Sequence, residues 1–298
     1  MESGWGGTNQ HIPVLLDAVL SYLRVRPDGI YLDCTVGLGG HASALQELLS
    51  PNGQLIGLDG DKEAVKHCRL RLSPSCHLVH APYDTFPTHL VELGIKQVDG
   101  MLIDLGISSY QLDTAGRGFS YRNDGPLDMR FDVDAPISAR DIVTGWSKDQ
   151  LRKLFREYGE ERRASAIAAA VVDARGKKAI ESTGQLAQII ESVVGTHAST
   201  KTLSRIFQAI RIAVNDELGA LKRFMERFVD YLSVGGRLVV ISYRLEKGCT
   251  CPPDVPVCRC GLTPSLELLT KRVVRPPEAE VASNPRARSA RLRAAEKI

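Results

Sequence analysis

A glycine-rich turn near the start of the chain has the residue types of a ligand site. Residues 33–41 read Asp-Cys-Thr-Val-Gly-Leu-Gly-Gly-His, between a short apolar strand pattern and a helical pattern. A strand that runs into glycines and then into a helix lets the backbone approach a ligand closely. About twenty residues beyond the glycines, the apolar segment 55–58 ends in Asp59, at the spacing where a carboxylate accepts hydrogen bonds from a ribose. Together these features favour a nucleoside cofactor, although an ordinary strand-to-helix turn would also need glycine.

The same turn departs from the dinucleotide-binding fingerprint G-x-G-x-x-G. Residues 37–41 read Gly-Leu-Gly-Gly-His and lack the third glycine. In the dinucleotide-binding fold that glycine allows the helix to pack closely on the strand. A nicotinamide-dependent oxidoreductase built on a similar sheet is therefore the less favoured alternative.

The elements that must position this turn follow an alternating pattern. Helical patterns of 10–15 residues separate four apolar segments with the length of buried strands: 29–32, 55–59, 77–80 and 98–105. Such alternation predicts parallel βαβ units and a doubly wound α/β sheet. Ligands of such sheets bind at the carboxyl ends of the strands. The exit of the fourth strand carries Asp104 and Ser108, and Tyr83 after the third strand could pack on an adenine.

The alternation stops after the fourth strand, and helical patterns alone fill the middle of the chain. We therefore predict a first part of the α/β core at 1–112, an inserted helical domain at 113–200 and a second part of the core at 201–298. Residues 235–242 form a strong strand pattern, and residues 266–274 could add an antiparallel edge. The insertion has basic residues at positions expected to be exposed, which indicate either RNA contact or an ordinary solvated face: Arg152, Lys153, Arg156, Arg162, Arg163, Arg175, Lys177 and Lys178.

Composition and charge narrow the class of protein. No run of about 18 apolar residues is present, and the first residues lack the pattern of a signal peptide, so we expect a cytoplasmic protein without a membrane span. The net charge is only +3. Residues 271–298 nevertheless contain eight Lys or Arg against three Glu. This basic C-terminal tail is either a solvated terminus or an arm that contacts phosphates.

Four cysteines cluster in the last third of the chain, as Cys249-x-Cys251 and Cys258-x-Cys260. In a cytoplasmic protein such a cluster is more often a metal site than a pair of disulfides. Zinc ligands are usually spaced C-x2–4-C, however, so we predict no metal here. A proline-rich loop with reduced thiols explains the same residues.

Longer motifs resemble the ribosomal RNA small subunit methyltransferase H family, also called MraW, whose members are S-adenosylmethionine-dependent N4-cytidine methyltransferases. The resemblance covers nearly the whole chain. The matching segments are 11–16, 33–41, 99–113, 117–120, 124–130, 158–161, 207–218, 251–258 and 284–293.

The resemblance implies a class I (Rossmann-like) methyltransferase core with an all-helical domain inserted after the fourth strand. It implies methylation of the N4 amine of a cytidine in the decoding region of 16S-type ribosomal RNA. The expected partner is that RNA or the assembled small subunit, and a homodimer stays open. By motif position the residues that contact S-adenosylmethionine are Gly39, Gly40, His41, Asp59, Tyr83, Asp104 and Gln111.

The chemistry that the resemblance implies is in-line attack of N4 on the sulfonium methyl group. The lone pair of this amine is delocalised into the ring, so short acceptors must orient its N–H bonds. The Asn/Asp/Ser-Pro-Pro-aromatic motif of many amino-methylases is absent after the fourth strand, and our candidates are Asp104, Ser108 and Asn215. The target base must leave its stack, and we expect the insertion and the Arg-rich tail to hold the RNA.

The chain departs from the family pattern after Ser242. Family members continue with a run similar to Phe-His-Ser-Leu-Glu-Asp-Arg and a helix, whereas residues 243–249 read Tyr-Arg-Leu-Glu-Lys-Gly-Cys. The shorter segment follows the carboxyl end of a strand and therefore lies near the expected active site. A catalytically weakened relative that binds the cofactor or the ribosome without turnover is the alternative to the enzyme.

Overall fold

The computed structural model describes residues 13–242 and 266–298 of the chain. These residues form two compact units, one made of residues 13–106, 223–242 and 266–298 and the other of Ile107–Lys222. The cysteine cluster and the shortened segment after Ser242 lie outside the described residues. Among the described residues, no helix has the length and apolar composition needed to cross a membrane.

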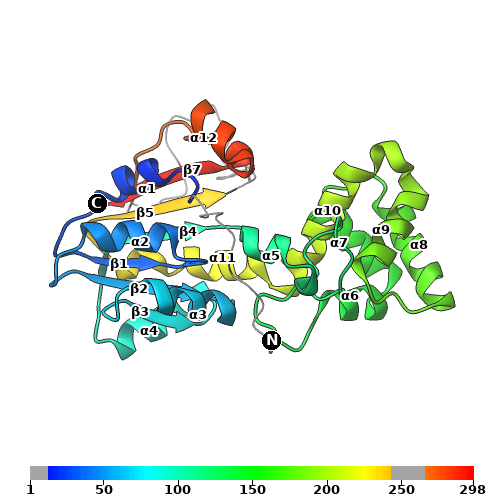
Figure 1. Ribbon diagram of the computed structural model, residues 1–298, viewed down its shortest axis with the longest axis horizontal. Coiled ribbons are helices and arrows are strands. Elements are labelled where there is room, and N and C mark those ends of the chain that lie inside the picture. Colours follow the sequence, from blue (N-terminus) through cyan, green and yellow to red (C-terminus); the bar gives the residue numbers. More distant parts are fainter. Residues whose placement is uncertain (1–12, 243–265) are drawn as a thin grey trace, which may run out of the picture. The chain divides into compact units, whose positions relative to one another are not determined.

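The first unit contains a seven-stranded sheet with the order β3-β2-β1-β4-β5-β7-β6 (Figure 1). Strands β1 to β5 are parallel to one another, and β7 runs antiparallel to both of its neighbours, β5 and β6. This arrangement confirms the predicted doubly wound α/β sheet. The strands are β1 (Ile30–Asp33), β2 (Gln54–Asp59), β3 (His77–His80), β4 (Val98–Asp104), β5 (Leu232–Ser242), β6 (Leu266–Leu268) and β7 (Arg291–Lys297).

The two faces of this sheet bury separate apolar clusters. In β4, Leu102 belongs to one cluster, whereas Met101 and Ile103 belong to the other. Successive strand residues point to opposite faces, so a strand covered on both faces reads as a continuous apolar run. The helices of this unit are α1 (Leu16–Leu23), α2 (Gly40–Leu48), α3 (Lys62–Arg71), α4 (Phe86–Glu92) and α12 (Glu278–Ser283), with single-turn helices η1 (Tyr83–Thr85), η3 (Phe228–Tyr231) and η4 (Pro285–Ser289).

The prediction of a basic C-terminal tail is wrong for the last residues of the chain, because Arg291–Lys297 forms the inner strand β7. Leu292 and Ala294 of this strand are buried. Its charged residues also have partners within the unit, since Arg237 Nε donates to Glu296 Oε2 at 2.8 Å and Lys297 Nζ donates to two backbone carbonyls at 2.7 Å. The edge strand predicted at 266–274 is present as the shorter β6.

The second unit is helical and has its own apolar core. Ser147 begins α7 with the capping box that its sequence predicts, and the same motif begins α6 and α9. The boundary between the two units lies within α11 (Glu217–Met225), between Lys222 and Arg223. The other helices of the second unit are α5 (Ser109–Asp113), η2 (Ala115–Arg117), α6 (Ala139–Gly145), α7 (Lys148–Glu157), α8 (Ala164–Lys177), α9 (Thr183–Val194) and α10 (Thr196–Val214).

This unit is longer than the insertion expected at 113–200. The helix α10 continues through position 200, and Leu203, Ile206 and Ile210 pack into the helical core. From the sequence, these residues were expected in the second part of the α/β core, 201–298. Their spacing shows a buried helix face, and only the tertiary packing decides which core receives it.

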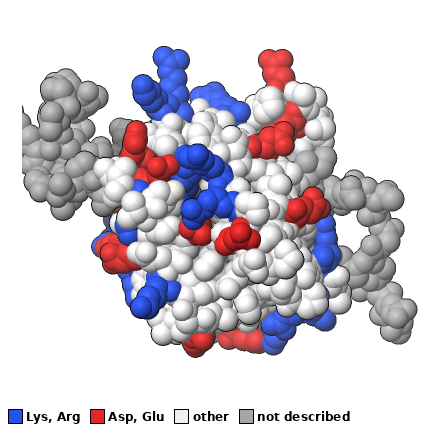
Figure 2. Space-filling model, turned by 90° about the vertical axis from the view of Figure 1, so that its left-hand side faces the viewer, with Lys and Arg blue, Asp and Glu red and all other residues white. Residues whose placement is uncertain are grey.

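Charge is mixed on the face of the molecule that lies at the left of Figure 1. Figure 2 shows Lys and Arg side chains interspersed with Asp and Glu side chains there, with uncharged surface between them. Binding to RNA phosphates would favour an extended positively charged surface. The described residues of this face form no such surface.

Candidate functional site

The parallel strands bring four polar strand ends to one edge of the sheet. Asp33 ends β1, Asp59 ends β2, His80 ends β3 and Asp104 ends β4. The register pairs Asp33 with Gly57 and with Leu102, so Asp59 and Asp104 each extend two residues further. Asp59 pairs with His80. This edge is where open α/β sheets bind their ligands.

The turn after β1 needs glycine for two reasons. Gly37 and Gly39 have φ angles of 52° and 80°, in the left-handed region that disfavours other residues. A Cβ atom on Gly39 would lie 3.1 Å from Cys68 Sγ, and one on Gly40 would lie 3.1 Å from Cβ of Pro13. Gly39 precedes α2 and has no side chain to cap it. The turn therefore presents backbone N–H groups at the start of α2, where a helix favours an anionic group.

Asp59 is tied directly to this turn. Its Oδ2 accepts a hydrogen bond from the Gly37 N–H at 2.8 Å, and its Oδ1 accepts one from the Asp61 N–H at 2.8 Å. A carboxylate oxygen has two lone pairs, so each oxygen retains an acceptor position. The residue is partly exposed. Asp59 can therefore receive two hydroxyl donors of a ligand while it holds the turn.

Burial raises the pKa values of two carboxyl groups at this edge. Burial raises the pKa of Asp33 to about 7, with a smaller contribution from the charge of Asp59, against a hydrogen bond from the Thr35 N–H. Burial likewise raises the pKa of Asp59 to about 6, although the N–H groups of Asp61 and Gly37 favour its ionised form. A group that donates hydrogen bonds to Asp59 would favour that form further.

Thr35, which was not among the residues predicted from the sequence, connects the turn to the end of β4. Its hydroxyl oxygen accepts a hydrogen bond from the Asp104 N–H at 2.7 Å, and its own N–H donates to Asp33 Oδ1 at 3.1 Å. The position of Asp104 is thus fixed relative to the glycine turn. The sequence signal was a hydroxyl residue two positions after a strand-end aspartate, which is typical of a side-chain-capped turn.

Tyr83 lies in η1, directly after β3, and is partly exposed. Its ring packs edge-to-face on Phe224, with 6.0 Å between the ring centroids. The next residue, Asp84, accepts a hydrogen bond from Arg223 Nε at 2.7 Å. Both partners come from α11, more than a hundred positions away, and no local pattern could have indicated them. The predicted contact of Tyr83 with an adenine stays a prediction.

His41 has a bracing role in the described structure. The residue is buried in the first turn of α2, and its Nε2 lies 2.9 Å from the carbonyl oxygen of Val14. The carbonyl can only accept, so Nε2 donates in this contact. The bond joins α2 to the segment before α1. Contact between His41 and a cofactor is not tested by this geometry.

Ser108, Gln111 and Asn215 belong to the second unit and are described there by themselves. Ser108 caps α5, with its Oγ accepting from the Gln111 N–H at 3.2 Å, while Gln111 Oε1 accepts from the Ser108 N–H at 3.0 Å. Asn215 uses its whole carboxamide: Oδ1 accepts from the Phe131 N–H at 2.7 Å, and Nδ2 donates to two carbonyls, of Met129 at 2.8 Å and Arg211 at 2.9 Å. Each of these three side chains thus has a local structural role.

Two features define a class I methyltransferase core. One is the strand order with the antiparallel strand β7, and the other is a glycine turn whose Gly37 N–H donates to Asp59 at the end of the next strand. The helical unit interrupts this core after β4, as the resemblance in the sequence implies. A model of the MraW methylase family matches residues 8–298, and the chain belongs to this family.

Two curated relatives are named ribosomal RNA small subunit methyltransferase H. The chain is 46% identical to the one from Symbiobacterium thermophilum over 307 positions, which cover 97% of this chain and 96% of the relative. It is 48% identical to the one from Nitratidesulfovibrio vulgaris strain DP4, over 97% of this chain and 95% of the relative. Among solved structures, an rRNA methylase from Streptococcus thermophilus aligns with 95% of this chain and 93% of its own, at 12% identity. Its TM-score of 0.41 is too low to add to the assignment.

Among residues 13–242 and 266–298, no three His, Cys, Asp or Glu side chains gather in a way that could hold a metal ion. The cysteine cluster lies outside these residues, and the prediction that it binds no metal stays untested.

Proposed function

We propose that the protein transfers a methyl group from S-adenosylmethionine to the N4 amine of a cytidine in the decoding region of small-subunit, 16S-type ribosomal RNA. Membership of the MraW family and the names of the curated relatives support this proposal. The structural observation that carries it is the pair of hydrogen bonds by which Asp59 joins the glycine turn, since they form a nucleoside-binding arrangement at the carboxyl edge of the sheet.

The residues of this edge fit the proposed cofactor. Asp59 retains acceptor positions for ribose hydroxyls, and Gly39 and Gly40 let the turn lead directly into α2, whose first N–H groups favour an anionic group. Tyr83 offers a partly exposed aromatic ring for the adenine. The sulfonium of the bound cofactor supplies the methyl group, and the protein contributes orientation of both reactants.

On the substrate side, the amine needs acceptors for its N–H bonds. Asp104 and Ser108 remain the candidates, because Asp104 is fixed by Thr35 at the end of β4 and Ser108 begins the next helix. The side chain of Asn215 accepts and donates its hydrogen bonds within the second unit. We therefore propose no contact between Asn215 and the reacting amine.

The helical unit presents basic residues for an RNA backbone. Arg152, Lys153 and Arg156 are exposed on α7, as are Arg162 and Arg163 before α8. Lys and Arg side chains supply the phosphate contacts that position proteins on nucleic acids. Arg175, which the sequence analysis also named, is partly buried and donates to the carbonyl of Val143 at 2.8 Å. We place the RNA contact on the α7 side of this unit.

The test uses purified protein, radiolabelled S-adenosylmethionine and small subunits that lack the modification, followed by nucleoside analysis. Label in N4-methylcytidine, lost in Asp104→Ala, would support the proposal. Label in another nucleoside would refute the substrate, and absence of label would refute the activity. The same preparation, analysed by sedimentation, decides whether the protein forms the homodimer left open above. Activity on ribosomal subunits would also agree with a cytoplasmic location.

A second candidate function is binding of cofactor and ribosome without turnover. The shorter segment 243–249 favours it. The alignment with the Symbiobacterium relative also spans 307 positions, more than the 298 residues of this chain, so that relative carries residues that this chain lacks. Calorimetric binding of the cofactor, combined with no methyl transfer to the subunit, would favour this candidate over the enzyme.

A further inference from the structure

A three-residue segment of the second unit, Met129–Phe131, has an unusual set of hydrogen bonds. It belongs to neither a helix nor a strand, yet every backbone N–H and C=O group in it is paired. The Met129 N–H donates to the Arg117 carbonyl at 3.0 Å, and the Arg130 N–H donates to Asp128 Oδ1 at 3.0 Å. Asn215 and the Arg117 guanidinium provide the partners of the other four groups. We call this segment the Met129 turn.

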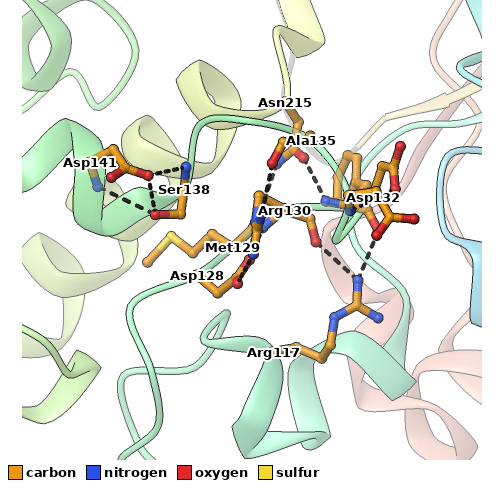
Figure 3. A network of polar contacts seen from close by, with 11 residues as sticks. Arg117, Asp128, Met129, Arg130, Asp132, Ala135, Ser138, Asp141 and Asn215 are labelled. Carbon is orange, nitrogen blue, oxygen red and sulfur yellow. Dashed lines mark hydrogen bonds and ion pairs between the residues drawn. The ribbon is translucent and has the colours of Figure 1, made fainter.

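Asn215 and Arg117 hold the Met129 turn from opposite sides in the view of Figure 3. The carboxamide of Asn215 accepts from the Phe131 N–H and donates to the Met129 carbonyl. The Nη2 atom of Arg117 donates to the carbonyls of Arg130 at 2.9 Å and Phe131 at 3.0 Å. One amide and one guanidinium thus fix the backbone of all three residues. Asn215 must both donate and accept hydrogen bonds, which a carboxylate cannot do. Arg117 must donate two hydrogen bonds in the plane of its guanidinium, which the ammonium of a lysine does not reproduce.

The backbone held in this way is strained. Met129 has a φ of 60°, in the left-handed region that residues with a Cβ rarely adopt. Its side chain is fully buried in the apolar core of the unit. Such conformations persist only where the surroundings over-determine them, and they concentrate at functional sites. The strained turn sets the direction in which the chain leaves the core after Met129.

The chain after the turn forms a fixed and exposed loop, 132–137. Arg130 fixes it by donating from Nη1 to the Ala135 carbonyl at 2.7 Å, while its Nε and Nη2 bind the two oxygens of Asp128 at 2.9 and 2.7 Å. Val133 and Ile137 of the loop are 46% and 50% exposed, and Asp134 is exposed as well.

The chemistry of this loop fits nucleic-acid bases better than phosphates. Apolar side chains contact base faces and can wedge between bases, and carboxylates accept hydrogen bonds from the amino group of cytosine. A carboxylate such as that of Asp134 would repel a phosphate. An unpaired RNA segment, whose base faces and edges are accessible, matches the loop on both counts.

We propose that Asn215 and Arg117 are positioning residues that hold the Met129 turn, so that loop 132–137 contacts unpaired bases of the RNA substrate. This inference rests on the proposed function, because it takes ribosomal RNA as the substrate. It also replaces the earlier expectation that Asn215 acts on the reacting amine.

The test compares four variants of the full-length protein. Asn215→Asp keeps the size of the side chain but removes both N–H donors, and Arg117→Lys keeps the charge but removes the planar pair of donors. Val133→Ser with Ile137→Ser changes only exposed side chains of the loop, so it leaves the fold intact. Val171→Ala is the matched control, because it weakens the same helical core by deleting buried methyl groups of α8 away from the turn.

Measurements on each variant are kcat and KM for the small subunit, affinity for the subunit by sedimentation, and cofactor affinity by calorimetry. We expect Asn215→Asp, Arg117→Lys and the loop variant to lower kcat/KM for the subunit by about tenfold or more, with cofactor affinity within about twofold of wild type. Val171→Ala should keep kcat/KM for the subunit.

Three results would overturn the inference. An unchanged kcat/KM in the loop variant would show that loop 132–137 does not contact the RNA. A loss of cofactor affinity in Asn215→Asp would show that the Met129 turn supports cofactor binding instead. A loss of kcat/KM in Val171→Ala equal to that of the turn variants would show that the turn contributes only to stability. If the wild-type protein transfers no methyl group, the proposed activity fails, and subunit affinity alone decides the inference: it must fall in the turn and loop variants and not in the control.

Discussion

Replacing Asp59 by asparagine tests the cofactor site, because the two side chains have the same size and differ in charge and hydrogen bonding. In the structure the two carboxylate oxygens accept from the N–H groups of Gly37 and Asp61, both at 2.8 Å. The amide of asparagine keeps one acceptor and turns its NH2 group toward the other N–H donor. We expect Asp59→Asn to lose one bond to the turn and one acceptor for the ribose.

The size of the effect follows from the charge of the acceptor. A hydrogen bond to a charged group contributes about 1.5–3 kcal/mol, so the loss of one ribose bond should weaken cofactor binding about 10- to 150-fold. The pKa of Asp59 is raised to about 6 by burial. Hydroxyl donors bind the ionised form, so cofactor affinity should fall as the pH decreases through about 6. At pH 5 about one tenth of the carboxyl groups are ionised, and binding should be about tenfold weaker than at pH 7.5.

The assay is calorimetric titration with S-adenosylhomocysteine, the demethylated product, from pH 5 to pH 8. Asp61→Asn is the matched control, because Asp61 is the neighbouring carboxylate and caps α3 by accepting from the Glu63 N–H at 3.0 Å. It should retain the pH dependence of the wild type, whereas Asp59→Asn should lose it. An affinity that does not change with pH in the wild type, or an Asp59→Asn affinity within twofold of it, would refute the role of Asp59.

Other residues of the same edge give further predictions. Burial raises the pKa of Asp33 to about 7, so its contribution to stability is present below about pH 4 and is lost as the pH rises through about 7; Asp33→Asn should flatten that fall in thermal unfolding from pH 5 to pH 8, and an unchanged slope would identify another group. Gly39→Ala places a Cβ in the left-handed region, 3.1 Å from Cys68 Sγ, and should lower the free energy of unfolding by about 1–3 kcal/mol in urea; an unchanged midpoint would contradict the steric argument. Thr35→Val leaves the Asp104 N–H without its acceptor and should cost about 1–3 kcal/mol of stability and raise KM for the cofactor; unaltered kinetics would exclude Thr35 from positioning Asp104.

Strands of the sheet could be predicted from the sequence where their buried positions are occupied by apolar residues. Strand β4 is buried on both faces, and its residues 101–103 form a short apolar run. Strand β7 was missed because Leu292 and Ala294 are its buried positions and charged residues surround them. An alanine next to arginines has no strand preference of its own. The neighbours that make this segment a strand, β5 and β6, come from elsewhere in the sequence.

The candidate site divides in the same way. The glycine turn and Asp59 could be identified as candidates from local spacing, and the structure joins them by a hydrogen bond, while their contact with a cofactor stays a prediction. The partners of Asn215, in contrast, lie 84 and 86 positions away, at Phe131 and Met129. Its residue type shows only that it can both donate and accept. The sequence therefore identified Asn215 as a candidate, and only the structure shows which groups it binds.

The interruption of the sheet between β4 and β5 has a consequence during synthesis. Strands β1 to β4 come from one continuous part of the chain, but the partner of β4 on its other side is β5, with Gly100 opposite Arg237. At synthesis rates of about 5–20 residues per second, β5 is made on the order of ten seconds after β4. Throughout that time an apolar strand edge is open to pairing with other chains, which is the usual beginning of aggregation. Because of the helical insertion, the β4 edge of the nascent chain thus stays unpaired for longer than it would in an uninterrupted sheet.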